Sequence, residues 1–319
     1  MSRSSDLLSR LESLNRGKLR DTVTTGSLID DLKRKRRKTE DENSAKKDAS
    51  APALLYRRDL PTVKRSSSRV SSPIDEMPFV NLEASLPGTT IEAGPFGLAY
   101  LIETRNFGII AQEMLAGDFA SQVADDASPL RQRLAAREIV RADLSPHDIM
   151  IVDVESTGLG SAQLFLIGTL LWHEESLVVR QYLARTYAEE AAVINLFVQS
   201  IRDKKLVISF NGKSFDLPFI RMRAAASAVP FSVRADHWDL LHECRRIYKG
   251  KMPNCRLQTL ELHVCGRARS DDIPSADIPR AYHDYVRTNN AAEMVSIISH
   301  NMQDMVTLVD LMTRFPGLG

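Results

Sequence analysis

The sequence predicts an α/β fold in which helices flank a mixed sheet, three antiparallel strands followed by parallel strands, behind a disordered N-terminal extension. Runs of strand length that are rich in Ile, Leu and Val follow one another closely between residues 147 and 183. Beyond residue 187, segments with helical periodicity alternate with short apolar runs. Much of the first 78 residues, by contrast, consists of charged residues, Ser and Pro.

We divide the chain of 319 residues into three regions. Residues 1–78 are expected to be disordered or linker-like, because stretches such as KRKRRKTEDENSAKKDAS (33–50) cannot bury enough surface to offset chain entropy. Residues 79–145 are expected to form a small lead-in of strands and a helix, and residues 146–319 the main domain. Leucines at helical spacing within residues 5–15 predict a short amphipathic helix, which either frays in solution or docks on a protein partner.

The lead-in and the main domain are each predicted element by element. In the lead-in, strand-like runs precede one helical run, and these are FVNLEAS (79–85), TTIEAG (89–94), GLAYLIETR (97–105) and the helix at 128–141. In the main domain, an antiparallel meander is predicted from the strands 147–154, 162–172 and 176–183. The elements expected next are a helix at 187–202, a strand at 205–210, a helix from Ser214, a weak strand at 235–239 and further helices. This order is the ribonuclease-H-like arrangement.

Composition indicates the cellular compartment but no particular binding partner. The chain has 42 Lys and Arg residues against 41 Asp and Glu residues, so its net charge of +1 indicates no particular ligand. Its three cysteines, Cys244, Cys255 and Cys265, form no CxxC pair, which favours a reduced intracellular protein. No run of about 18 apolar residues occurs, and the polar start lacks the apolar core of a secretory signal. We therefore expect a cytoplasmic protein with no membrane partner.

The first candidate motif is DVEST (153–157), at the end of the strand rich in Ile and Val. Asp153 and Glu155 are two residues apart, so their side chains project from the same face of the sheet. Two carboxylates on one face repel each other unless a cation lies between them, and hard cations such as Mg²⁺ prefer oxygen ligands. The pair indicates half of a metal site, and a solvated strand end is the alternative.

The second candidate motif is ISFNGKSFDLPFI (208–220), where a strand turns through Asn-Gly into a helix that carries Asp216. Strand ends and helix starts are where open sheets place their ligands. Asn211 could orient a substrate or serve only the turn. Asp216 could join the metal site or only complement the helix dipole. Farther along, Asp239 either supports the site or caps the helix that follows it.

The third candidate motif is SIISHNMQDMVTLVDLM (296–312), a predicted helix. His300 and Asp304 are four residues apart and therefore lie on one face, at the edge of an apolar stripe. Such a pair belongs either to an active site or to an ordinary hydrogen-bonded pair at the surface. Before this helix, Asp271 and Asp272 either line a cleft or cap a turn.

In this order along the chain, the three motifs resemble those of the DEDD exonucleases of the DnaQ-like superfamily. DVEST matches the first motif, NGKSFD the second and HNMQD the third. The chain resembles still more closely the YprB-like family of predicted exonucleases, which carry a ribonuclease-H-like domain. This resemblance covers residues 147–315 and includes TGLGSAQLFLIG, SFNGKSFDLPFI, CRLQTLE, DDIPSADIP and HNMQDMVTL.

The resemblance implies a 3′-to-5′ exonuclease that hydrolyses phosphodiesters with two Mg²⁺ or Mn²⁺ ions. The implied metal ligands are Asp153, Glu155, Asp216 and Asp304, and the implied general base is His300. Four carboxylates offset two dications, and an imidazole titrates near neutral pH, so the residue types suit this chemistry. Family members carry His-x4-Asp or Tyr-x3-Asp in the third motif, whereas His300 stands at the position of the tyrosine.

The implied partner is a nucleic acid, DNA or RNA, presented as a single-stranded 3′ end. Candidate substrate contacts are Thr157, after the first motif, and Asn211, in the second. Arg245 and Lys249 belong to a basic band that suits a phosphate backbone or is an ordinary helix surface. The sequence shows no motif that reads a base or a 2′-hydroxyl, so it does not separate DNA from RNA. A non-catalytic nucleic-acid-binding module on the same fold is the main alternative.

Overall fold

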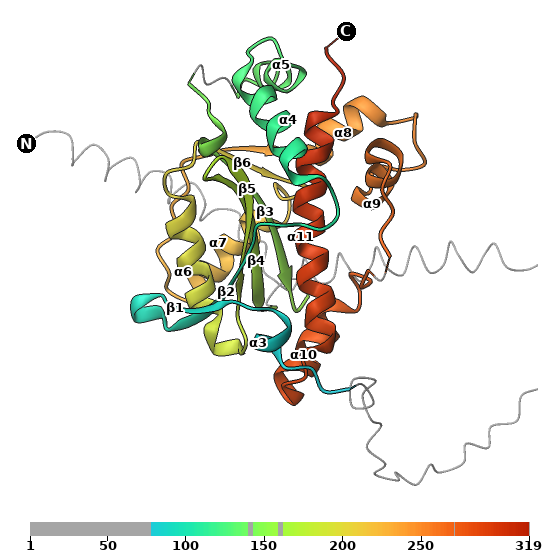
Figure 1. The fold of residues 1–319 in the computed structure, drawn as a ribbon. Helices are drawn as coiled ribbons and strands as arrows, with labels where there is room; N and C mark the ends of the chain where they lie inside the picture. Colours follow the sequence, from blue (N-terminus) through green and yellow to red (C-terminus); the bar gives the residue numbers. More distant parts are fainter. Residues whose placement is uncertain (1–77, 140–142, 159–161, 271, 319) are drawn as a thin grey trace, which may run out of the picture. The chain divides into compact units, whose positions relative to one another are not determined.

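The structure, a computed structural model, describes residues 78–139, 143–158, 162–270 and 272–318 (Figure 1). The predicted N-terminal extension, except its last residue Pro78, lies outside these residues together with its leucine stripe. The predicted fold class is confirmed, because the described chain forms one seven-stranded mixed sheet with helices on both faces. None of the helices in these ranges combines the length and the apolar character that crossing a membrane requires.

The sheet has the strand order β1-β2-β5-β4-β3-β6-β7. The strands are β1 (Thr89–Glu92), β2 (Leu98–Thr104), β3 (Ile149–Ser156), β4 (Leu164–His173), β5 (Ser176–Leu183), β6 (Leu206–Ser209) and β7 (Asp236–Asp239). The predicted meander of β3, β4 and β5 is antiparallel, and β6 and β7 continue it in parallel. Of the two strands of the lead-in, β2 pairs with β5 and β1 pairs with β2, so they extend the sheet of the region that follows.

Helices cover the two faces of this sheet (Figure 1). One face carries α6 (Glu190–Ile201) and α7 (Asp216–Ala226), and the other carries α11 (Ala292–Thr313) and α4 (Gln112–Ala124). The other α-helices in the described part of the chain are α3 (Leu82–Ser85), α5 (Pro129–Ala135), α8 (Leu240–Tyr248), α9 (Leu257–Leu260) and α10 (Ile278–Thr288). Short 3₁₀ turns occupy Gly94–Phe96, Pro146–Asp148 and Tyr187–Glu189, and Glu261–Cys265 forms a π-helical turn.

Two expectations for the lead-in were wrong. FVNLEAS is not a strand, because the Asn81 side chain accepts a hydrogen bond from the Ala84 backbone N–H at 2.9 Å and caps the short helix α3. The helical run at 128–141 ends early, at Ala135, and Glu138 beyond it has a φ of 60°. The longer helix α4 was missed, since Gly117 interrupts its apolar residues.

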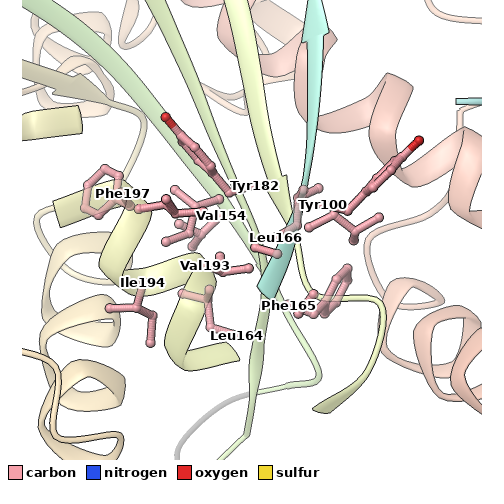
Figure 2. Close-up of a cluster of buried hydrophobic side chains, with 14 of the residues drawn as sticks. Tyr100, Val154, Leu164, Phe165, Leu166, Tyr182, Val193, Ile194 and Phe197 are labelled. Carbon is pink, nitrogen blue, oxygen red and sulfur yellow. The ribbon is translucent and has the colours of Figure 1, made fainter. Parts of the chain in front are cut away.

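The alternation of side chains along β3 decides where its acidic residues point. Met150, Val152 and Val154 pack toward α6 and α7 in one core cluster, whereas Ile149 and Ile151 pack with the C-terminal half of α11 in another. Figure 2 shows the first cluster, where Val154 meets side chains of α6 between the helix and the sheet. Continuing the period of two, Asp153 and Glu155 project on the side of α11.

The last helix approaches the sheet most closely at Gly168 in β4. A Cβ atom added there would lie 2.1 Å from the Asn301 side-chain oxygen and 2.6 Å from Met305 Cε, both on α11. The Gln181 amide of β5 donates to Asn301 Oδ1 at 2.9 Å and to the Ile298 carbonyl at 2.8 Å. Gly168 therefore allows a helix to dock on the sheet at the depth that the site requires.

Replacing Gly168 by alanine is expected to lower the free energy of unfolding by about 1–3 kcal/mol, because the added methyl group overpacks the contact between β4 and α11. Urea denaturation followed by circular dichroism measures the change. Gly117→Ala is the matched control, since Gly117 lies within α4 and its added Cβ meets nothing within 4 Å. That control should raise stability by about 0.5–1 kcal/mol. Equal stabilities of Gly168→Ala and the wild type would contradict the close approach.

Candidate functional site

The structure brings the four predicted carboxylates together from three elements. Asp153 and Glu155 lie in the C-terminal half of β3, Asp216 is the first residue of α7, and Asp304 lies in the middle of α11. Their charges act on one another, because Asp304 raises the pKa of each of the other three carboxyls. The three motifs, which span more than 150 residues of sequence, thus converge at one end of β3.

Burial and mutual repulsion make these carboxyls hard to ionise together. Burial raises the pKa of Asp153 well above its usual range, and the charges of Asp304, Glu155 and Asp216 raise it further. Burial likewise raises the pKa of Glu155, with Asp304, Asp216 and Asp272 adding to the effect. Burial, then Asp239 and Asp304, raise the pKa of Asp216 to about 8. A positive charge bound among these groups would relieve the repulsion.

The turn before α7 fixes the position of Asp216. Asn211 has a φ of 67°, a left-handed conformation that Asn tolerates better than most residues. A Cβ atom on Gly212 would lie 2.4 Å from Asp216 Oδ2, so only glycine lets the turn pass this close to the carboxylate. Asp239 accepts backbone N–H bonds from Asn211 at 2.8 Å and from Lys213 at 3.0 Å. Asp239 therefore pins the turn that carries Asp216.

Of the two roles left open for Asp239, the structure also bears out the helix cap. Its side chain accepts from the Leu241 backbone N–H at 3.0 Å, at the start of α8. Because the Asp239 carboxylate is only 2% exposed and accepts three backbone N–H bonds, it stays occupied as a structural acceptor. Its charge still reaches the site through its effect on the pKa of Asp216.

The third motif is held within the protein and is not an ordinary pair at the surface. His300 is 5% exposed, its Nδ1 lies 2.6 Å from Asp272 Oδ1, and its Nε2 lies 3.7 Å from Asp304 Oδ2. The neighbouring Asn301 is fully buried and donates from Nδ2 to Asp153 Oδ2 at 2.7 Å. One helix therefore supplies a carboxylate, an imidazole and an amide to the same site.

Arg269 is the cation that the described residues place next to the carboxylates. Its Nη2 lies 2.5 Å from Asp304 Oδ1, and its Nε donates to Glu261 Oε2 at 2.6 Å. The Arg269 side chain is only 5% exposed, so this ion pair is poorly screened by solvent. Burial would lower the pKa of Arg269, but Asp304 and Glu261 outweigh that effect and raise it.

The four carboxylates suit a divalent cation that prefers oxygen ligands, because a dication offsets their repulsion. In addition, Asp216 Oδ2 is buried without a hydrogen-bond partner. Across the described ranges, however, no three Asp, Glu, His or Cys side chains form a ready-made metal cluster. Oxygens of Asp153 and Asp304 are already bonded to Asn301 and Arg269. Binding an ion therefore requires some of these side chains to shift.

A cleft of 560 Å³ opens beside the carboxylates. Asp153, His300 and Asp304 line it, together with the predicted substrate contacts Asn211 and Arg245. Its walls also include the apolar residues Phe210, Leu241, Leu257 and Leu308. A second cavity of 400 Å³ shares Arg245, Asn254 and Cys255 with the cleft and adds Lys249. The predicted basic residues thus continue from the acidic site along one surface.

Other predicted contacts lie away from the cleft walls. Glu155, Asp216 and Thr157 are not among the residues that line it. Thr157 accepts a side-chain hydrogen bond from the Gln163 backbone N–H at 2.9 Å and so closes the loop after β3. Asp271 lies outside the described residues. Whether Thr157 contacts a substrate stays a prediction.

The sequence prediction missed two residues that touch the predicted ones, Asn301 and Arg269, and it missed the partner of Asp272. Asn301 follows His300 directly and could have been noted as the buried position of the HNMQD run. Arg269 and Asp272 lie in a segment without regular periodicity, RSDDIP (269–274). The sequence placed Asp272 at a cleft or a turn but gave it no partner, and the contact with His300 appears only in three dimensions.

Comparisons with known proteins agree with the predicted family and fold. The family model of the RNase_H superfamily matches residues 150–315. The curated uncharacterized protein YprB of Bacillus subtilis (strain 168) is 29% identical over 170 residues, which are 52% of this chain and 41% of that protein. The chain therefore spans less than half of that relative's length. The predicted YprB-like, ribonuclease-H-like domain is confirmed, and the exonuclease subtype stays a prediction.

Among solved structures, the chain is similar to the family B DNA polymerase from the hyperthermophilic archaeon Pyrobaculum calidifontis. The similarity has a TM-score of 0.42 at 16% sequence identity, and it covers 54% of this chain and 25% of the polymerase chain.

Asp216→Asn should stabilise the metal-free protein, and the gain should grow as the pH rises from 4 to 8. In the unfolded chain this carboxyl ionises near its ordinary pKa of 3.8, whereas in the folded protein it keeps its proton up to about pH 8. Folding then takes up a proton between these values, so wild-type stability falls across that window. Asparagine does not titrate. Urea denaturation in EDTA at several pH values measures the difference.

Asp148→Asn is a control of opposite sign. Burial would raise the pKa of Asp148, but hydrogen bonds from Ser145 and Lys205 lower it below its ordinary value. Its contribution to stability is therefore present at neutral pH and is lost as the pH falls through the lowered pKa. Asp148→Asn should destabilise the protein at pH 7. A loss of stability in Asp216→Asn at pH 8 would contradict the assigned repulsion.

Proposed function

Because the chain belongs to the RNase_H superfamily over residues 150–315, we propose that it is a metal-dependent nuclease. Its activity is that of a DEDD-type 3′-to-5′ exonuclease, a phosphodiester hydrolase that acts on DNA or RNA. The observation that carries the proposal is the convergence of Asp153, Glu155, Asp216 and Asp304, whose mutual repulsion a divalent cation would relieve. A cytoplasmic location belongs to the proposal, and the free thiols of the three cysteines support it.

Each side chain of the site has a proposed task. Asp153, Glu155, Asp216 and Asp304 would hold two Mg²⁺ or Mn²⁺ ions. When bound, such ions make water more acidic and stabilise the charge that develops on a phosphodiester. His300 would accept the proton of the attacking water through Nε2, the ring nitrogen on the side of Asp304. Asn301 would keep Asp153 in place through its hydrogen bond to Oδ2.

The cleft suits a single nucleic-acid strand whose 3′ end reaches the carboxylates. Its apolar walls beside Asp153 and Asp304 offer a surface for a base, and the cations of Arg245, Arg256 and Lys249 suit the phosphates that follow. Asn211, at the end of β6, faces the same cleft with an amide that could bond to a sugar or phosphate. The chemistry of these walls favours a strand over a small soluble ester.

One observation favours the alternative, a non-catalytic module that binds nucleic acid on the same fold. Arg269 pairs with Asp304, so a cation of the protein itself already occupies one side of the site. A protein that had lost its chemistry would keep the basic residues of the cleft and bind strands without cutting them. The two proposals differ in whether Mn²⁺ is bound and whether the strand is shortened.

Cleavage of end-labelled oligonucleotides in Mn²⁺ tests the proposed activity. The wild type should shorten single-stranded DNA or RNA from the 3′ end, and Asp153→Asn should lose at least about a hundredfold of that rate, since it removes one metal ligand. Asp118→Asn, a carboxylate change in α4, is the control and should keep the wild-type rate. Equal rates for Asp153→Asn and the wild type would overturn the site, and binding without cleavage by the wild type would favour the alternative.

Arg245→Gln should weaken the binding of single strands, because Arg245 lines both the cleft and the second cavity beside it. The slope of log K against log salt should become shallower by about 0.7, the expectation for one lost phosphate contact on a single strand. Fluorescence anisotropy over a salt series, in Ca²⁺ or EDTA, measures this slope.

Arg246→Gln is the matched control on the same helix. Arg246 lies 3.4 Å from Glu243 and lines a different cavity, so its loss should leave the salt slope unchanged. Equal effects of the two substitutions would mean that the strand does not follow the cleft.

A further inference from the structure

The His300 ring is held from outside its own helix. Its Nδ1 lies 2.6 Å from Oδ1 of Asp272, which belongs to the segment before α10. A carboxylate oxygen without a proton can only accept, so Nδ1 carries the hydrogen of this bond, and in the neutral ring Nε2 then keeps its lone pair. The Asp272 and His300 side chains are 13% and 7% exposed, so water competes little for this bond.

Asp272 is itself fixed on its other oxygen. Gln258 Nε2 donates to Asp272 Oδ2 at 3.0 Å, and Arg269 Nη1 lies 3.5 Å from the same atom. Both carboxylate oxygens are thus engaged, Oδ2 by groups of α9 and the following segment and Oδ1 by His300. The charged groups around the ring are Asp272 on one side and Asp304 on the other, with Arg269 in contact with both.

This arrangement leaves one ring nitrogen directed at the carboxylates. Nε2 lies 3.7 Å from Asp304 Oδ2, too far for a hydrogen bond, and His300 lines the cleft. His300 and Asp304 share a helix face at a spacing of four residues, so the helix alone sets their separation but not the rotation of the ring. An external group is needed to set that rotation, and Asp272 is placed to do so.

We propose that Asp272 is a positioning residue that holds His300 with its Nε2 toward the metal-binding carboxylates, ready to accept the proton of the attacking water. The proposal rests on the proposed nuclease function and assigns to Asp272 no contact with metal or substrate. Carboxylates that orient a histidine in this way fix its tautomer and raise its basicity. Arg269 and Asp272, which precede α10, then support the third motif.

The tautomer of His300 tests the positioning without any activity. The chain has seven histidines, and long-range ¹H–¹⁵N spectra of ¹⁵N-histidine-labelled protein report the protonated nitrogen of each, with His300→Ala assigning the signal. The wild type should show the Nδ1–H tautomer at His300, and Asp272→Ala should lose it. Asp277→Asn, an exposed carboxylate directly before α10, is the control and should keep it. An unchanged His300 signal in Asp272→Ala would overturn the proposal.

Kinetics test the same assignment in the working protein. Asp272→Ala should reduce the single-turnover rate in Mn²⁺ by about tenfold or more, with unchanged KM and unchanged Mn²⁺ affinity by calorimetry. In the His300→Ala background the same substitution should have no further effect. Asp272→Asn keeps one acceptor oxygen and should lose less.

Three results would contradict the positioning role: an unchanged rate in Asp272→Ala, a parallel loss of Mn²⁺ affinity, or an equal further loss in the His300→Ala background. A wild type that binds Mn²⁺ but cuts neither DNA nor RNA would instead contradict the nuclease on which this proposal rests. The tautomer measurement would then still decide whether Asp272 orients His300.

Discussion

The contact between α11 and the centre of the sheet is the constraint on which the site depends. Asn301 lies where this helix crosses β4 at Gly168, and its two amide atoms bond in opposite directions, to Gln181 of β5 and to Asp153 of β3. Because Asn301 is fully buried, neither bond competes with water. The depth and rotation of α11 follow from this contact, and with them the positions of His300 and Asp304 on either side of Asn301.

The burial and mutual repulsion of the carboxylates destabilise the fold, and the surrounding residues partly offset this effect. Four acidic side chains meet where burial already raises the pKa values of Asp153, Glu155 and Asp216. The Arg269 guanidinium forms an ion pair with Asp304, and it is also paired with Glu261 and Asp272. A protein that needed only stability would do better with apolar residues here. Keeping the carboxylates is consistent with a site whose remaining charge is supplied by bound cations.

The sequence was sufficient for the fold class and for the prediction that the acidic residues lie close together, for identifiable reasons. The alternation of β3 places Asp153 and Glu155 on the side of α11, and the Asn-Gly turn delivers Asp216 at the start of α7, as their local patterns indicate. Local patterns could not supply the contacts made across the fold. The bond between Asp272 and His300 joins residues 28 apart, and the bond between Asn301 and Asp153 joins residues 148 apart. In the lead-in, where Asn81 starts a short helix and Gly117 lies within a longer one, weak local preferences misled the prediction.

Anomalous diffraction from crystals of the protein soaked in Mn²⁺ tests the metal site most directly. We expect manganese between Asp153, Glu155, Asp216 and Asp304, with the Asp304 carboxylate turned from Arg269 toward the metal. Manganese elsewhere on the surface, or none, with the pair between Arg269 and Asp304 intact, would contradict the claim that these carboxylates form a metal site.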